Sequence, residues 1–333
     1  MQVGHSLSAE STLERAAFDN QDMAAIRKAT PQLLKRLQEG ISSFELVYTP
    51  HPHWPLRASN TSTGAGSPLR ISVLDSSFNP PTKAHLGLAN SRPPFLNDPN
   101  ADYDARLLLL SVKNADKTLK PGDARYEQRI EMMSLLARSI NPSADSPSGP
   151  SPHTTPEDIS NTAIGIIDEP IFAGKSSLIL SYLDGLLASR SAGTGSSAPV
   201  VELTFLVGLD TLERLFSTRY YASESAMVDT LRKFILPRPD GEGSRIVCAD
   251  RAASNSASWP DPKAMESAQE FMDSGRISII DMGNELSTYS STTVRRSVGS
   301  LGQDDSPAGT WRKLVTKDVA EYIVENGLYQ TEL

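Results

Sequence analysis

The chain has 333 residues, of which 38% are hydrophobic and 22% are charged, so it can bury at least one large core and is not disordered throughout. Its formal net charge of −8 disfavours nucleic-acid binding as a main function. With a single cysteine, no basic and apolar leader, and no apolar run of the roughly 20 residues that cross a bilayer, we expect a cytoplasmic protein, with nuclear entry left open.

The first 68 residues are predicted to form an N-terminal appendage made of a helix and a short strand. Residues 22–39 have the apolar spacing of a helix, which Pro31 is expected to split into two pieces, with Thr30 capping the second. The strand is predicted at residues 44–48.

Short runs rich in Val, Ile and Leu alternate with helical patterns along residues 69–333. Buried strands are predicted at residues 69–75, 107–112, 163–168, 201–207, 234–236 and 277–281. Helices are predicted at residues 83–91, 126–140, 176–189 and 265–273. Because strands separated by helices pair in parallel through right-handed crossovers, we expect an α/β fold with a doubly wound, Rossmann-like parallel sheet. Ligands of such sheets bind beyond the carboxyl ends of the strands.

Three stretches are rich in Ser, Pro, Gly and Thr, a composition that cannot bury enough apolar area to offset the entropy of ordering. We interpret residues 57–68 as a linker at the end of the appendage, and residues 141–160 and 189–199 as low-complexity inserts in the main domain.

A first motif, SSFNPPTKAH, follows the strand at residues 69–75 and opens a helix. Thr82 and His85 lie three residues apart at the helix start, where backbone amides and the helix dipole favour an anion. The motif therefore fits a phosphate site. The structural alternative is that Ser77 and Thr82 only cap the helix and that His85 is an ordinary half-buried histidine.

A second motif, YSSTTVR, follows the strand at residues 277–281 and also opens a helix. Hydroxyls and backbone amides at Ser291 and Thr292, with Arg295 one turn later, suit a polyphosphate tail. The structural alternative is a Ser/Thr cap beside a solvated arginine pair. Two motifs of this kind after two strands of one sheet favour the functional interpretation.

The two motifs resemble those of the nicotinamide mononucleotide adenylyltransferases, most closely the fungal branch, in the HIGH nucleotidyltransferase superfamily. The family pattern GSFNPxTxxH is similar to residues 76–85, and ISSTxxR is similar to residues 289–295. FLVGLD at residues 205–210 resembles the family's strand ending in GxD, and residues 314–329 resemble its terminal helix. The resemblance covers residues 69–329 and implies the nucleotidyltransferase fold for the main domain.

Two residues depart from the family pattern. Ser76 stands where the family usually has glycine, which affects how closely phosphate can approach the backbone. Tyr289 replaces an aliphatic residue, a change that affects packing more than chemistry.

The resemblance implies that the 5′-phosphate of nicotinamide mononucleotide attacks the α-phosphorus of ATP, giving NAD and pyrophosphate. His85 would donate to the α-phosphate in the transition state, Thr82 would position the same phosphates, and Arg295 would hold the β and γ phosphates. Further phosphate contacts would come from the backbone amides of Ser77 and Phe78 and from Ser291 and Thr292. Mg²⁺ would bridge the phosphates largely through water, so no protein metal ligand is expected.

The remaining contacts implied by the resemblance lie on other strand ends. Gly208 and Asp210 would contact the adenosine, although Asp210 could equally cap the following helix. Lys117 would face the mononucleotide phosphate, although most lysines are solvated surface residues. Phe172 would stack on the nicotinamide, with Lys175 available to a carboxylate on the base, although an aromatic residue at such a position is more often core.

Two other functions stay open. An adenylyltransferase for another phosphate substrate, nicotinic acid mononucleotide or phosphopantetheine, would share both motifs. A noncatalytic nucleotide-binding regulatory protein is suggested by Ser76 and the long inserts, but the presence of His85, Thr82 and Arg295 argues against it. We expect ATP and nicotinamide mononucleotide as ligands, with no nucleic acid and no membrane partner. The sequence does not predict the oligomeric state.

Overall fold

The computed structural model describes residues 6–56, 67–98, 100–113, 122–140, 160–192, 197–250, 262–299 and 310–330. Within them, one seven-stranded sheet has the order β1-β4-β3-β2-β5-β6-β7. The strands are β1 (Phe44–Tyr48), β2 (Leu69–Asp75), β3 (Ala105–Ser111), β4 (Thr162–Ile167), β5 (Val201–Gly208), β6 (Arg245–Asp250) and β7 (Ile277–Asp281). β2 to β7 pair in parallel and β1 pairs antiparallel with β4. The predicted α/β fold with a doubly wound parallel sheet is confirmed.

The strand order reverses at β2, which has β3 on one side and β5 on the other. In doubly wound sheets this reversal marks the place where ligands bind, beyond the carboxyl ends of the two central strands. The first motif follows β2, and Gly208 ends β5, so the fold brings both to this place.

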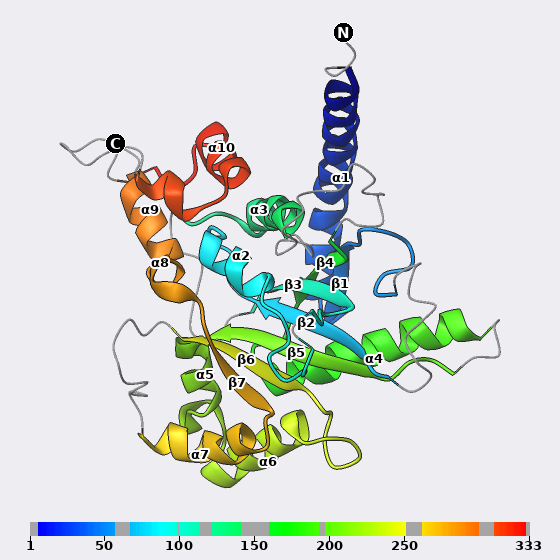
Figure 1. Cartoon of the computed structure of the whole chain (residues 1–333), viewed down its shortest axis with the longest axis vertical. Helices are drawn as coiled ribbons and strands as arrows, with labels where there is room; N and C mark the ends of the chain where they lie inside the picture. Colours follow the sequence, from blue (N-terminus) through cyan, green and yellow to red (C-terminus); the bar gives the residue numbers. More distant parts are fainter. Residues whose placement is uncertain are drawn as a thin grey trace.

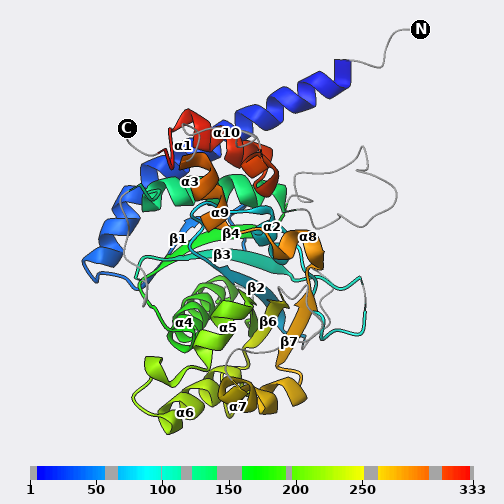
Figure 2. The ribbon, with the colours of Figure 1, turned by 90° about the vertical axis from the view of Figure 1, so that its left-hand side faces the viewer.

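Helices cover both faces of the sheet, as Figures 1 and 2 show. One face carries α1 (Ser6–Gln38), α2 (Lys83–Ala89), α3 (Tyr126–Ser139), α8 (Gly283–Ser287), α9 (Ser291–Gly299), the 3₁₀ helix η3 (Thr310–Leu314) and α10 (Lys317–Glu325). The other carries α4 (Phe172–Ser191), α5 (Leu209–Leu215), η2 (Thr218–Tyr220), α6 (Glu224–Ile235) and α7 (Pro262–Asp273). Among the described helices, none combines the length and low polarity that a membrane crossing needs.

Each face of the sheet has its own hydrophobic core, because alternate residues of a strand point to opposite faces. Ile71 and Val73 of β2 join the core under α4 to α7, whereas Leu74 joins the core under α1 to α3. A third cluster around Trp311 and Val294 packs α9, η3 and α10 against α3. This third cluster fixes the second motif relative to the rest of the fold.

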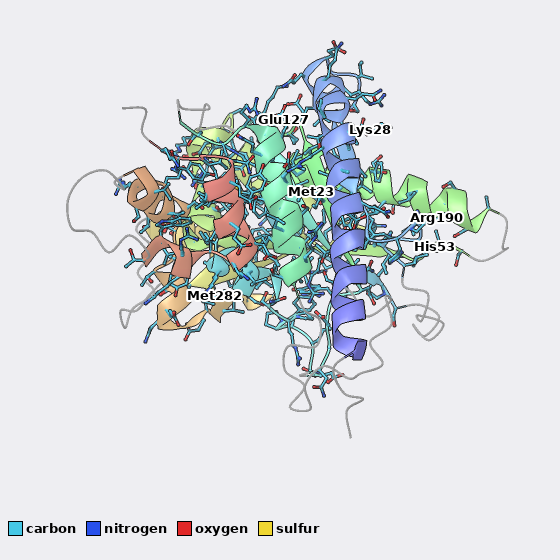
Figure 3. All side chains as sticks on the ribbon, turned by 90° about the horizontal axis from the view of Figure 1, so that it is seen from above. Met23, Lys28, His53, Glu127, Arg190 and Met282 are labelled. Atoms are coloured by element: carbon cyan, nitrogen blue, oxygen red, sulfur yellow. The ribbon has the colours of Figure 1, made fainter. Side chains whose placement is uncertain are left out.

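The N-terminal segment packs against the main sheet. β1 extends the sheet beyond β4, and α1 lies beside α3, where Met23 of α1 contacts Ser134 of α3 (Figure 3). Arg27 forms a salt bridge of 2.7 Å with Glu131 across the same contact. Near the far end of α4, Arg190 donates to backbone carbonyls after β1, including that of His53 (Figure 3).

The expected split of the first helix at Pro31 is wrong, because α1 runs continuously through it. Pro31 is exposed, so water can reach the carbonyl that its missing N–H leaves without a helical partner. Thr30 is not a cap: it is buried inside the helix, and its Oγ1 donates to the Ile26 carbonyl at 2.7 Å.

The strand predicted at residues 234–236 is also wrong. Phe234 and Ile235 end α6, where they share its buried face with Met227 and Leu231 at helical spacing. A three-residue apolar run does not distinguish a strand from a buried helix end. The real strand is β6, which the sequence analysis missed.

The low-complexity segments lie mainly outside the described residues. The described residues do not include 57–66 of the linker, 141–159 of the first insert or 193–196 of the second. The second insert was predicted to begin too early, because α4 continues through Ser191.

Cys248 on β6 is expected to be unreactive in the folded protein. Burial raises the pKa of its thiol to about 12, so only about one molecule in 10⁴ carries the thiolate at pH 8. A thiol reagent such as Ellman's reagent should label one site rapidly in urea and far more slowly without it. Equal rates in the two conditions would contradict this expectation.

Candidate active site

The first turn of α2 orients His85. Thr82 is the N-cap of α2, and its backbone N–H donates to His85 Nδ1 at 3.0 Å, with Thr82 Oγ1 2.9 Å from the same nitrogen. A backbone N–H can only donate, so Nδ1 is the acceptor and the neutral ring carries its proton on Nε2. That Nε2 lies 2.9 Å from Ser76 Oγ. Thr82 therefore caps the helix, as the structural alternative proposed, and also fixes the tautomer of His85.

The loop before α2 is anchored in the core by the side chain of Phe78. Its side chain is fully buried, and its ring centroid lies 5.4 Å from that of His85. Phe78 has a φ of +44°, a left-handed conformation that is uncommon for a bulky residue. The neighbouring Ser77 carbonyl accepts a long hydrogen bond of 3.5 Å from Arg129 Nη1 on α3.

Asn79 connects the loop to three other segments. Its Nδ2 donates to Asp123 Oδ1 at 2.8 Å, and its Oδ1 accepts from the Tyr329 hydroxyl at 2.9 Å. Its backbone carbonyl accepts from Arg295 Nη1 at 2.6 Å. Sequence analysis did not single out Asn79, Asp123 or Tyr329. The signals were the place of Asn79 inside the first motif and that of Tyr329 at the end of the stretch that resembles the family's terminal helix.

The second motif docks directly on the first. Ser291 Oγ donates to the Pro80 carbonyl at 2.7 Å, next to the bond between Arg295 and Asn79. Ser290 is the residue that caps α9, because its Oγ accepts from the Thr293 N–H at 3.1 Å. The two motifs, predicted from separate parts of the chain, thus form one site.

The rest of the second motif has simpler surroundings. Thr292 is exposed, with its Oγ1 3.4 Å from Arg295 Nη2. Tyr289, which departs from the family pattern, is buried, and its hydroxyl donates to Glu285 of α8.

Gly87 allows α8 to approach α2 closely. A Cβ at this position would lie 2.7 Å from Leu286 Cδ1 and 2.8 Å from Met282 Cε, contacts shorter than real carbon pairs adopt. α8 leads into the second motif, and both contacts are with the ends of flexible side chains, so a larger residue at position 87 requires those side chains to shift. Sequence analysis did not identify it.

Two arginines share one carboxylate beside the loop. Arg129 Nη2 lies 3.8 Å and Arg295 Nε 3.6 Å from Asp123, which leaves one net positive charge. Arg129 is buried, and this burial lowers its pKa while Asp123 opposes the change. The Arg295 side chain is 31% exposed, so it has room to contact an anion from solvent. Arg129 on α3 was missed by sequence analysis.

The carboxyl end of β5 leads straight into α5. Gly208 is the N-cap of this helix, and the exposed Asp210 lies in its first turn, so the alternative of Asp210 as the cap is wrong. A Cβ at Gly208 would meet no atom within 4 Å, which means that the space beside this strand end is open.

Phe172 and Lys175 lie in the first turn of α4. The Phe172 ring packs edge-on against Phe205, with centroids 5.6 Å apart, as the core alternative proposed. Lys175 Nζ lies 4.8 Å from the Phe172 ring centroid and forms a salt bridge with Asp75 at the end of β2. Both side chains of this pair are buried, and the charge of Lys175 is compensated within the chain.

Lys117 lies outside the described residues. Lys113, earlier in the same stretch, forms a salt bridge of 2.6 Å with Asp168. The described residues contain no group of three or more His, Cys, Asp or Glu side chains that could hold a metal ion.

Comparison with known proteins identifies a relative that is similar in sequence. No protein-family model matches the chain. It is 28% identical over 261 residues to a Schizosaccharomyces pombe protein named "Putative nicotinamide mononucleotide adenylyltransferase", covering 76% of this chain and 83% of the relative. The resemblance to this group of proteins, predicted from the motifs, is confirmed.

Two solved structures are also similar, both of Plasmodium falciparum nicotinic acid mononucleotide adenylyltransferase. The one complexed with NaAD has a TM-score of 0.41 and 14% identity, covering 78% of this chain and 97% of the other. The one complexed with APC has a TM-score of 0.40 and 12% identity, covering 78% and 96%.

Proposed function

We propose that this protein is an enzyme that transfers the adenylyl group of ATP to nicotinamide mononucleotide, giving NAD and pyrophosphate. The observation that carries the proposal is the docking of the two motifs through the Ser291–Pro80 and Arg295–Asn79 hydrogen bonds. This docking brings Arg295 to the loop that leads into His85. The name of the Schizosaccharomyces pombe relative supports the same reaction.

The chemistry needs alignment and charge stabilisation more than proton transfer. An oxygen of the mononucleotide phosphate forms a bond to the α-phosphorus, and the bond from that phosphorus to the bridging oxygen of pyrophosphate breaks. The attacking phosphate is already ionised near neutral pH, so no general base is needed. His85 Nε2–H then donates to an α-phosphate oxygen as charge develops, with Thr82 holding the ring in place.

Arg295 is assigned to the β and γ phosphates, together with Ser291 and Thr292 at the start of α9. Its guanidinium is anchored by the Asn79 carbonyl and keeps part of its surface exposed. The net positive charge that Arg129 and Arg295 leave around Asp123 suits a polyphosphate.

Mg²⁺ is assigned to the phosphates of ATP, as part of the substrate. This ion keeps several waters and prefers phosphate and carboxylate oxygens. The Asp123 carboxylate faces two arginines, so it suits the positioning of the loop better than the binding of a cation. When bound, the ion neutralises charge on the phosphates.

The adenosine is assigned to Gly208, the last residue of the strand adjacent to β2, and to Asp210 just after it. Lys117 is assigned to the mononucleotide phosphate, and Phe172 to the nicotinamide ring. Because Lys175 is already paired with Asp75, it offers little to a carboxylate on the base. The amide form is therefore the preferred substrate, and the acid form is a weaker one.

An assay with single substrates tests this function. The purified chain is incubated with ATP and Mg²⁺ and, in turn, nicotinamide mononucleotide, nicotinic acid mononucleotide or phosphopantetheine. Pyrophosphate release should be fastest with nicotinamide mononucleotide, and NAD should accumulate in the same amount. Release only with phosphopantetheine would identify a different adenylyltransferase, and no release with any acceptor would favour a noncatalytic protein.

Replacing Arg295 with alanine should raise KM for ATP about 10- to 100-fold and that for the mononucleotide much less. A charge-assisted hydrogen bond contributes roughly 1.5 to 3 kcal/mol, and in this assignment only ATP loses it. Initial rates over a range of each substrate give both constants. Arg296→Ala, the adjacent exposed arginine of α9, is the matched control and should change neither. Equal losses for both substrates would place Arg295 elsewhere.

A further inference from the structure

The hydroxyl of Ser76 lies within hydrogen-bond distance of His85 Nε2, the nitrogen that the proposed function assigns to a phosphate oxygen. His85 Nδ1 accepts from the Thr82 backbone, so the hydrogen of the neutral ring is on Nε2, and Ser76 Oγ lies 2.9 Å from this nitrogen. The acceptor of the Nε2–H is therefore a side chain of the protein itself. Glycine, the usual residue of the family pattern at this position, would leave this hydrogen to a ligand.

The backbone of Ser76 is held in place while its side chain can rotate. The Ser76 N–H donates to the Leu109 carbonyl at 3.2 Å, which continues the ladder between β2 and β3. Serine has three staggered χ1 positions, so its hydroxyl can leave His85 with no change in the backbone. The imidazole has less freedom, because Thr82 contacts it through both its backbone and its hydroxyl.

We propose that Ser76 competes with nucleotide for His85: its hydroxyl and an α-phosphate oxygen of ATP bind the same hydrogen of the imidazole. Nucleotide binding then requires the serine side chain to rotate away, at the cost of one hydrogen bond. The inference rests on the proposed function, because it takes ATP as the ligand of His85. Its consequence is weaker ATP binding than the same site would have with alanine or glycine at position 76.

A double-mutant cycle tests the competition. The dissociation constant of α,β-methylene-ATP with Mg²⁺ is measured by calorimetry for the wild type, Ser76→Ala, His85→Ala and the double variant. We expect Ser76→Ala to bind about 2- to 10-fold more tightly than the wild type, the range set by the net strength of one hydrogen bond. In the His85→Ala background, the same substitution should change the constant by less than 2-fold.

Two further variants support the cycle. Ser76→Gly should tighten binding in the same direction, and both Ser76 variants should lower KM for ATP while keeping kcat within about 2-fold. Ser91→Ala is the matched control, because Ser91 also donates a side-chain hydrogen bond, to Leu88 at the other end of α2. It should leave the affinity unchanged.

The outcomes separate this inference from the proposed function. Weaker binding by Ser76→Ala would mean that the hydroxyl itself binds the phosphate, and unchanged binding would mean that no competition exists. Equal tightening with and without His85 would indicate a gain of space alone. Each of these results overturns the competition while ATP binding stands. Absence of binding by the wild type would contradict the proposed function and the competition together.

Discussion

Replacing His85 with alanine is expected to lower kcat by roughly 10²- to 10³-fold and leave the protein folded. A preorganised donor aimed at charge that develops in the transition state has an effect of this size when it is removed. The proposed function assigns this role to the Nε2–H of His85, whose tautomer the Thr82 backbone fixes and whose ring lies next to that of Phe78.

Steady-state rates of NAD formation, with both substrates saturating, measure the effect. The matched control is His53→Ala, which removes an exposed imidazole that lies before β2 and outside both motifs. It should keep the wild-type rate. A thermal melt of each variant checks that the fold is intact. Near-normal turnover by a folded His85→Ala protein would remove His85 from the catalytic role.

Replacing Asp75 with asparagine is expected to lower the free energy of unfolding by about 3 to 5 kcal/mol. The salt bridge between Asp75 and Lys175 leaves only 8% and 5% of the two side chains exposed. Removal of one partner of a buried pair leaves the other charge without compensation in a poorly solvated place. Lys175→Met should lower the free energy of unfolding by a similar amount, because it leaves the buried Asp75 carboxylate without its partner.

Urea unfolding of the single variants and of the double variant Asp75→Asn, Lys175→Met tests this expectation. The double variant should recover much of the loss, because no unpaired charge remains. The salt bridge between Lys113 and Asp168 is the matched control, since its lysine is 68% exposed. Lys113→Met should cost less than about 1 kcal/mol. Equal losses of unfolding free energy at the two pairs would show that burial does not determine how much a salt bridge contributes to stability.

The strands that sequence could predict are those with long apolar runs. β1, β2 and β7 have the predicted bounds, because at least five consecutive residues fit a strand in each. β7 was predicted as a buried strand, but only Ile277 of it is buried. The error at residues 234–236 arose where three apolar residues ended a helix. Pro31 was misjudged because sequence does not reveal that it faces solvent, where a proline costs a helix less.

The site was predictable where its contacts are local. Thr82 and His85 are three residues apart, so helical geometry alone brings them together. Asn79, in contrast, contacts residues 44, 216 and 250 positions away, namely Asp123, Arg295 and Tyr329. Such contacts depend on how α3, α9 and α10 pack, and no local pattern encodes that packing. Arg129 was missed for the same reason.

The Asn79–Tyr329 hydrogen bond also sets an order of events during synthesis. A ribosome that adds 5 to 20 residues per second needs roughly 12 to 50 s to make the 250 residues that separate the two partners. During that time β2, β3 and the first motif can fold, but the C-terminal segment that holds Asn79 does not yet exist. The loop before His85 therefore cannot gain its hydrogen bond to Tyr329 until the end of the described chain has been made.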